Sequence, residues 1–337
     1  MTQYDDIFMR DALDDTGQIP SGVRTAYHSP DIIPWGNQTV SDPQTFFVDN
    51  YDQNPGKNLV ANEINYIYTR GKNLASAAAN GQIYLYWVKS SLLSQPSEWR
   101  NNKVPTATPG QNYSNVSASQ ANQIVVGESA FQWSVPAPPT GYHYCLVSQV
   151  VTAANPNPIP DDFNSTGGFV GWVVDNPGIA WRNVSVLSNA SPPSYQVTTA
   201  FQNLDDTEEL YAFTVEARNL PQGTTVSLVC SETGPNPPIN SSGTVTQQNP
   251  WYLYTENSLP AHFSSGLVTT VRLPSGQSWP PDATIDITYN RIVGSRDQEI
   301  LLRHAKTPAE MGLPEELHER VSGTMVRLGT YNIVVDS

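Results

Sequence analysis

Short runs of β-branched and aromatic residues, each closed by a turn, limit most strongly how this chain can fold. In the clearest run, Gln82–Val88, the side chains of Ile83, Leu85 and Trp87 would share one face of a strand. Similar runs recur along the chain at the spacing that is typical of β-sandwiches. We predict strands at 65–70, 82–88, 130–135, 142–150, 168–174, 179–187, 196–201, 210–218, 224–230, 251–254, 267–273, 284–289 and 325–335.

The connections between these runs are rich in residues that bend the backbone. The chain has 28 Pro and 22 Gly, and only 14% of its residues are charged, against about 25% in a typical soluble domain. Ser, Thr, Asn and Gln take the place of Lys and Glu, which disfavours long surface helices. The sequence therefore predicts an all-β fold with a neutral, polar surface.

One segment near the C-terminus has a helical pattern. Thr307-Pro308-Ala309-Glu310 combines a capping residue, a proline at the first helical position and a glutamate three residues after the cap. Leu313, Leu317 and Val321 would then lie on one face. We predict one short helix here, which either closes a sandwich or docks a partner.

The length of 337 residues fits two or three domains. The Ser, Asn and Pro residues of Ser188–Ser194 indicate a linker, and 66–74 and 212–220 share a strand-and-turn pattern. We predict two tandem immunoglobulin-like β-sandwiches with one short helix near the C-terminus. The predicted division is an N-terminal strand and linker at 1–22, a first sandwich at 23–190 and a second at 191–337.

The charge balance argues against several kinds of partner. The formal net charge is −14, and no cluster of Lys and Arg is present to neutralise phosphates. We therefore do not expect nucleic acid or anionic membranes as partners. No apolar run approaches the roughly 20 residues of a membrane span, and the acidic start does not resemble a Sec signal. We expect an extracellular location after lysis or non-Sec export, and a cytoplasmic one otherwise.

Motifs for catalysis are missing from the sequence. The five histidines form no motif, no Gly-x-Ser-x-Gly is present, and Gly167-Gly168 is expected to lead into a strand and not into a phosphate-binding helix. The adjacent carboxylate pairs Asp161-Asp162, Asp205-Asp206 and Glu208-Glu209 are expected in loops. We therefore predict that the protein is not an enzyme.

We expect no cofactor, and calcium is the one ion for which the sequence offers ligands. Asp49, Asn50 and Asp52 place several oxygen atoms in one short stretch. The same residue types also form ordinary turns through bonds to their own backbone. Cys145 and Cys230 lie far apart in the sequence, and we predict buried free thiols.

An aromatic cluster offers an alternative site. Trp251, Tyr252 and Tyr254 could stack against a sugar ring, with nearby polar side chains binding its hydroxyls. Strand alternation, however, would place Tyr252 on the face opposite Trp251.

Four segments of the first half share a pattern with a known family. They are His28-Ser29-Pro30-Asp31-Ile32, Asn65–Asn73, Gly141–Val147 and Ile179–Val184. In these segments the chain resembles CARDB-type, immunoglobulin-like adhesion modules of bacteria. The resemblance covers about residues 27–187 and implies adhesion or scaffolding without catalytic residues. The second half is similar only in its general strand and turn pattern.

The leading hypothesis is an adhesive or structural module that joins other proteins, as a homo-oligomer or in a larger, phage-like assembly. The alternative is a protein that binds cell-surface glycans within a toxin or attachment system. A hydrolase with a site built from loops is the third hypothesis. A glycan interaction that depends on Trp251 would favour the second, and measurable turnover would favour the third.

Overall fold

A computed structural model describes residues 2–21, 29–89, 95–137, 144–184, 186–187, 194–232, 238–280 and 282–334. Several predicted features lie outside these ranges. They are His28 and Gly141–His143 of the adhesion-module resemblance and residues 188–193 of the expected linker. The domain boundaries therefore stay a prediction.

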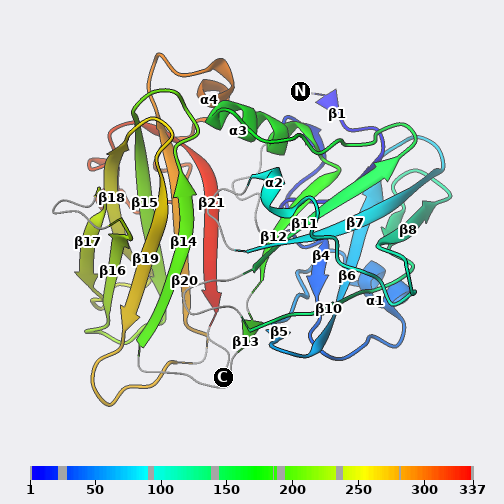
Figure 1. Cartoon of the computed structure of the whole chain (residues 1–337), viewed down its shortest axis with the longest axis horizontal. Coiled ribbons are helices and arrows are strands. Elements are labelled where there is room, and N and C mark those ends of the chain that lie inside the picture. The colour runs from blue at the N-terminus through cyan, green and yellow to red at the C-terminus, as the bar shows by residue number, and fades with distance from the viewer. Residues whose placement is uncertain are drawn as a thin grey trace.

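The first half of the chain forms a β-sandwich (Figure 1). One sheet has β6 at its centre, and the other has the order β12-β11-β7-β8. Alternate side chains of both sheets meet in a core that includes Ile67, Leu85, Phe131 and Leu146. The first sheet contains β2 (Ile7–Phe8), β4 (Ile32–Pro34), β6 (Ile64–Asn73), β9 (Ile124–Val126) and β10 (Phe131–Ser134), and the second contains β7 (Ala79–Lys89), β8 (Tyr113–Ala118), β11 (Tyr144–Thr152) and β12 (Ile179–Val184).

The N-terminal segment packs on its own chain. Ile7 pairs with Asn73 of β6, and the side chains of Ile7 and Met9 are buried in the same core. Two small ladders complete this half. They are β1 (Thr2–Gln3) with β3 (Gln18–Ile19), and β5 (Leu59–Val60) with β13 (Val186–Leu187).

The second half forms a sandwich of two four-stranded sheets, β14-β19-β16-β17 and β18-β15-β20-β21. Phe201 and Phe213 pack edge to face between them at 5.2 Å, and Phe213 stacks on Tyr289 at 5.0 Å. The strands are β14 (Ser194–Gln202), β15 (Glu209–Arg218), β16 (Thr225–Cys230), β17 (Asn240–Thr244), β18 (Trp251–Leu259), β19 (Ser264–Arg272), β20 (Thr284–Val293) and β21 (Thr324–Val334).

The two halves share one hydrophobic cluster. Val147 and Trp181 of the first half belong to the same buried cluster as Leu328 and Tyr331 of the second. The strands β12, β11 and β7 are therefore covered on both faces, once by the core of the first sandwich and once by helices and the second sandwich. The sequence prediction of all-β sandwiches is confirmed, whereas the immunoglobulin-like assignment stays a prediction.

The prediction of a single helix was wrong, because five short helices are present in the described residues. The predicted strand at 168–174 is the helix α3, which begins where the Ser165 hydroxyl caps the N–H of Gly168 at 3.1 Å. Gly167-Gly168 therefore lies in the first turn of a helix, contrary to our expectation. The helices are α1 (Pro43–Asp49), α2 (Pro96–Trp99), α3 (Thr166–Asp175), α4 (Glu299–His304) and α5 (Glu315–His318).

The helical pattern near the C-terminus is only partly realised. The Thr307 N–H donates to Glu310 Oε2 at 2.8 Å, and the Glu310 N–H donates to Thr307 Oγ1 at 3.3 Å, as in a capping box. The segment nevertheless forms turns, because Gly312 adopts a φ of 79°, outside the helical range. The helix α5 begins only at Glu315, beyond these turns. No helix among the described residues is long and apolar enough to cross a membrane.

Candidate binding site

A row of three threonines crosses the outer face of the sheet β18-β15-β20-β21. Thr214 of β15 lies opposite Thr288 of β20, which lies opposite Thr330 of β21. Successive side chains of a strand point to opposite faces, so the neighbours Val215 and Ile287 enter the core and the threonines point outward. The three hydroxyls therefore lie side by side on the sheet.

A small pocket lies over this row. Its volume is about 90 Å³, room for about three water molecules. It is open on one side, and the turn that precedes α5 forms part of its rim. The lining residues are Thr214, Thr288 and Thr330 of the row, Glu216, Tyr252, Asp286 and Arg327 from the surrounding strands, and Met311, Gly312 and Leu313 from the turn.

Two hydroxyls in this pocket have no hydrogen-bond partner in the protein. They are Oγ1 of Thr214 and Oγ1 of Thr330, and these residues are only 3% and 6% exposed. Thr288 differs, because its Oγ1 accepts a bond from Asn290 Nδ2 at 3.2 Å. A buried hydroxyl without a partner costs about 1–3 kcal/mol. Both oxygen atoms are shielded from solvent, so the row contains two buried hydroxyls that no protein group satisfies.

Glu216 and Tyr252 form one wall of the pocket. The Tyr252 hydroxyl donates to Glu216 Oε2 at 3.2 Å, and Arg218 forms an ion pair with the other oxygen of Glu216. Burial, together with the charge of Glu216, raises the pKa of Tyr252 to about 12. Tyr252 therefore stays protonated at neutral pH, and Glu216 retains lone pairs that can accept further bonds.

The structure does not assemble the aromatic cluster that we predicted. Tyr252 lines the pocket, but Trp251 points into the core, where it packs over Gly243 and is 7% exposed. Tyr254 lies on the outer face and is buried beneath Met311 and Leu317. Only one of the three aromatic residues is thus available to a ligand in the pocket.

The turn at Asp49–Gln53, which we considered for calcium, wraps around the guanidinium of Arg70. The Arg70 guanidinium donates to the carbonyl of Asn50 at 2.7 Å and to that of Gln53 at 2.6 Å, while Asp49 and Asp52 are exposed. Within the described ranges, no three His, Cys, Asp or Glu side chains are grouped to hold a metal ion. Calcium binding at Asp49, Asn50 and Asp52 stays a prediction.

Arg70 belongs to a buried ion network. Asp31 Oδ1 accepts from Arg70 Nε at 2.9 Å and from Arg10 Nη2 at 2.6 Å, and Asp31 is fully buried. The Arg10 guanidinium also lies 3.4 Å from the centre of the Tyr51 ring. This network joins the N-terminal segment to β6 and to the turn after α1.

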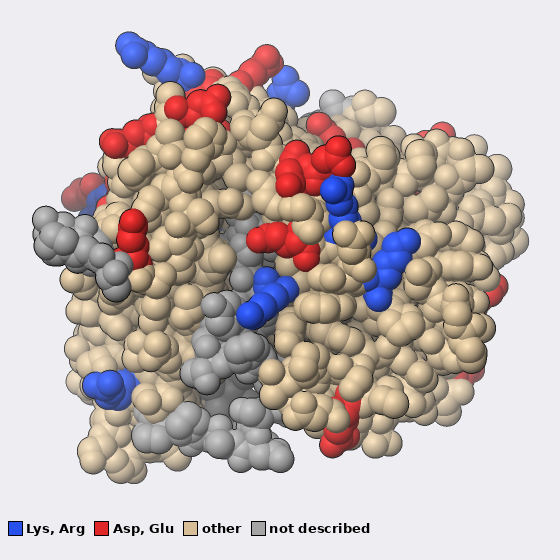
Figure 2. Space-filling view, viewed as in Figure 1, with Lys and Arg blue, Asp and Glu red and all other residues tan. Residues whose placement is uncertain are grey.

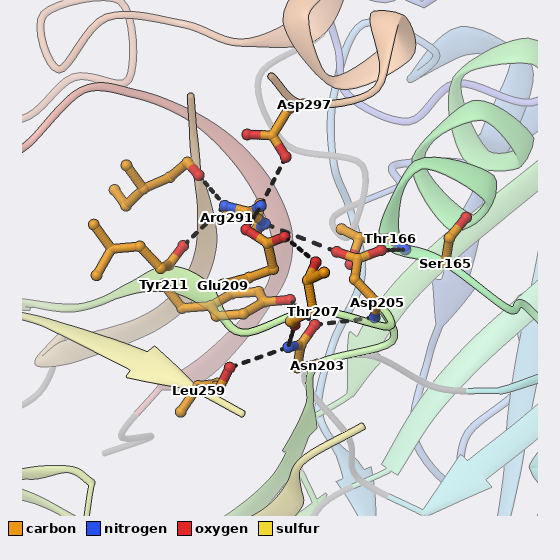
Figure 3. Close-up of polar contacts among 12 residues, drawn as sticks. Ser165, Thr166, Asn203, Asp205, Thr207, Glu209, Tyr211, Leu259, Arg291 and Asp297 are labelled. Atoms are coloured by element: carbon orange, nitrogen blue, oxygen red, sulfur yellow. Dashed lines mark hydrogen bonds and ion pairs between the residues drawn. The ribbon is translucent and has the colours of Figure 1, made fainter. Parts of the chain in front are cut away.

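A second ion network lies where the two halves meet (Figure 3). Arg291 is 2% exposed and contacts Glu209, Asp297 at 2.7 Å and Asp205 at 3.9 Å. Asp206, the neighbour of Asp205, instead binds the exposed His262 at 2.9 Å. Asp205 and Asp206, one of the adjacent carboxylate pairs considered for hydrolysis, thus have separate partners. The thiols of Cys145 and Cys230 are both buried and are not joined in a disulfide.

The strand β17 ends the sheet β14-β19-β16-β17, and its outer edge is open in that no other strand of the described residues pairs with it. The Cys230 N–H donates to Ile239 O, and the Val245 N–H donates to Thr224 O. In an antiparallel pair, opposite residues alternate between hydrogen-bonded and non-hydrogen-bonded, so these two bonds show which residues of β17 bond to β16. Ser241 and Gly243 therefore bond to β16, whereas the backbone groups of Asn240, Ser242 and Thr244 point away from it. These three residues are exposed.

Comparison with known proteins finds no matching family and no matching curated protein. Among solved structures, the chain is similar to the Enterococcus faecalis MSCRAMM ACE, which is described as binding its ligands by the collagen hug model. The identity is 10% and the TM-score is 0.18, and the match covers 83% of this chain and 93% of that one. It is also similar to CfaE, the adhesive subunit of CFA/I fimbria of enterotoxigenic Escherichia coli, with 10% identity, a TM-score of 0.21 and coverage of 99% and 94%. A vicilin from Solanum melongena matches at 8% identity with a TM-score of 0.13, over 81% and 88% of the two chains. These TM-scores are too low to assign a fold family or a function.

Proposed function

We propose that this chain is a non-enzymatic, adhesive or structural module of two tandem immunoglobulin-like sandwiches that joins other proteins in a larger assembly. The open edge of β17 carries the proposal. An added strand can bond to the outward backbone groups of Asn240, Ser242 and Thr244 and so extend the sheet.

The sequence of β17 supports this role. Natural proteins usually protect an open edge with Lys, Pro, a bulge or a covering segment. The strand Asn240–Thr244 reads Asn-Ser-Ser-Gly-Thr and contains neither charge nor proline, and its pairing with β16 is regular. It lies on the side of the second sandwich that is far from the first (Figure 1). A partner can therefore approach β17 without displacing the first sandwich.

The character of the surface supports assembly as well. Figure 2 shows that charged side chains are sparse and scattered on the face that it presents. The formal net charge of −14 repels a partner of the same charge sign at long range. Salt screens this repulsion, and the wide uncharged areas between the charged side chains leave room for short-range contacts with a partner.

The first experiment is size separation of complexes from the native source, followed by mass spectrometry of the proteins that travel with the chain. We expect co-migration with a large assembly. A variant then tests the surface. Ser242→Pro removes only an outward N–H, so β17 keeps its bonds to β16 and loses strand addition.

Ser242→Ala is the matched control, because it changes the side chain and keeps the N–H. Loss of co-migration in Ser242→Pro with retention in Ser242→Ala would support the proposal. A chain that migrates as a lone monomer in its native source, or a Ser242→Pro variant that assembles normally, would overturn it.

A further inference from the structure

We infer that the strand that adds to β17 belongs to a second copy of this chain, so that two copies pair antiparallel through their β17 edges. The inference rests on the function proposed above and names the first partner in the assembly. The two-fold axis of the pair passes beside Ser242, the middle residue of β17. Each copy contributes the four strands β14-β19-β16-β17, so the two sheets continue as one.

Two other edge strands bond to their own chain and so differ from β17. In β8, the carbonyl of Asn115 accepts from the N–H of Glu128 at 3.0 Å. In β18, the carbonyl of Tyr254 accepts from Arg320 Nη2 at 3.3 Å. In the part of the chain that the structure describes, no hydrogen bond reaches the outward backbone groups of β17. These groups are therefore left for a partner.

The register of β17 suits pairing with itself. Its outward N–H and C=O groups belong to Asn240, Ser242 and Thr244, which are spaced evenly about Ser242. In antiparallel pairing about the two-fold axis, Ser242 lies opposite its own equivalent, and Asn240 lies opposite Thr244 of the second copy. Every outward N–H then meets an outward C=O, so the pairing leaves none of these groups unsatisfied.

The side chains along this seam are small and uncharged. The strand β17 reads Asn-Ser-Ser-Gly-Thr, and its neighbour β16, Thr-Val-Ser-Leu-Val-Cys, also has no charged residue. Two copies that each carry a formal net charge of −14 repel at long range, and like charges directly opposite each other on paired strands would add to that cost. This pairing places none there. Salt should strengthen the pair, because it screens the net repulsion.

The position of β17 keeps the rest of each copy away from the seam. It lies on the side of the second sandwich that is far from the first (Figure 1). The first sandwiches therefore lie at opposite ends of the pair, where they can make other contacts in the assembly.

Disulfide trapping in the purified full-length chain tests the register. Ser242→Cys places two thiols on residues that face each other, with Cα atoms about 5.5 Å apart, which suits a disulfide. In Asn240→Cys, the two equivalent residues are separated by four positions along the paired strands, or about 14 Å, which is too far. We expect mild oxidation to give a covalent dimer from Ser242→Cys only. The parent chain should give none, because its own cysteines are buried.

A double variant checks the same register independently. Asn240→Cys combined with Thr244→Cys should restore the covalent dimer, because these positions lie opposite each other across the seam. Sedimentation equilibrium measures the pair without a cross-link. The mass of the parent chain should rise towards that of a dimer with concentration and with salt. Ser242→Pro removes both central bonds and should raise the dissociation constant by roughly tenfold or more, whereas Ser242→Ala should leave it unchanged.

Two results would overturn the inference. One is equal trapping of Ser242→Cys and Asn240→Cys, and the other is a parent chain that stays monomeric at every concentration and salt tested. Complexes from the native source that still depend on the N–H of Ser242 would then leave the proposed function intact, with a strand of a different protein on β17. The two proposals can therefore fail separately.

Discussion

The carboxylate of Asp205, in the second sandwich, accepts a hydrogen bond of 3.0 Å from the backbone N–H of Thr166, the first residue of α3 in the first half. A negative group at this position satisfies one of the free N–H groups of the helix and interacts favourably with its dipole. Asp205 also lies near Arg291, so one side chain connects α3 to the ion network of the second half.

Asp205→Ala should lower the free energy of unfolding by about 1–2 kcal/mol, because it removes a helix cap and a partner of Arg291. Urea unfolding followed by tryptophan fluorescence measures this change. Asp206→Ala is the adjacent control, since Asp206 is 91% exposed and its loss should cost less than about 0.5 kcal/mol. Equal effects of the two substitutions would contradict the capping role.

Arg70→Met should destabilise the first sandwich by about 3–5 kcal/mol, because it leaves Asp31 and several carbonyls buried without this cation. Thermal unfolding by circular dichroism measures the loss. Arg100→Met serves as a control, because its ion pair with Asp161 lies at the surface. A small effect at Arg70 would show that its guanidinium is not needed in this turn.

Asp11→Asn should stabilise the protein at neutral pH. Burial raises the pKa of Asp11 well above its usual value, and the nearby carboxylates of Asp15 and Asp31 add to the shift. Above the unfolded pKa of about 4, the folded state binds more protons than the unfolded state at this site, so stability falls as pH rises towards the folded pKa. The asparagine removes this loss.

The gain from Asp11→Asn should therefore be larger at about pH 7.5 than at about pH 4.5, and roughly 1 kcal/mol at the higher pH. Urea unfolding at both pH values provides the measurement. Asp14→Asn, at an exposed neighbouring position, controls for the change in net charge. An equal gain at both pH values would be inconsistent with the raised pKa.

Gly71→Ala should loosen the N-terminal segment. A Cβ at Gly71 would lie 2.7 Å from the backbone carbonyl oxygen of Phe8, and that oxygen cannot move without shifting β2. We expect a loss of about 1–3 kcal/mol and faster proteolysis before residue 20. In the control Gly171→Ala, the nearest atom of Ile300 lies at 3.6 Å, so α3 should accept the methyl group. Unchanged proteolysis of Gly71→Ala would count against this packing.

Most strands could be predicted from the sequence, because their β-branched and aromatic runs are bounded by turn residues. The helix α3 was missed for a physical reason. Its residues 168–174 contain Phe, Trp and three Val, which have strand propensity, but Phe169, Val170 and Val173 are buried in the shared hydrophobic cluster and hold the segment in a helix. The serine that caps the helix, Ser165, was a signal that could have identified it.

The candidate pocket could not be predicted in the same way. Thr214, Thr288 and Thr330 come from three strands and meet only through the register of the sheet. The missing bonds of two of their hydroxyls depend on side-chain packing, which no local pattern encodes. Only Tyr252 was found, because aromatic residues are conspicuous in sequence.

The hydrophobic cluster that crosses from Val147 and Trp181 to Leu328 and Tyr331 has a mechanical consequence. Because the two sandwiches are joined by packed side chains, a pull on one is transmitted to the other through a stiff contact. Under tension, the chain should therefore extend in one large step and not in two independent ones.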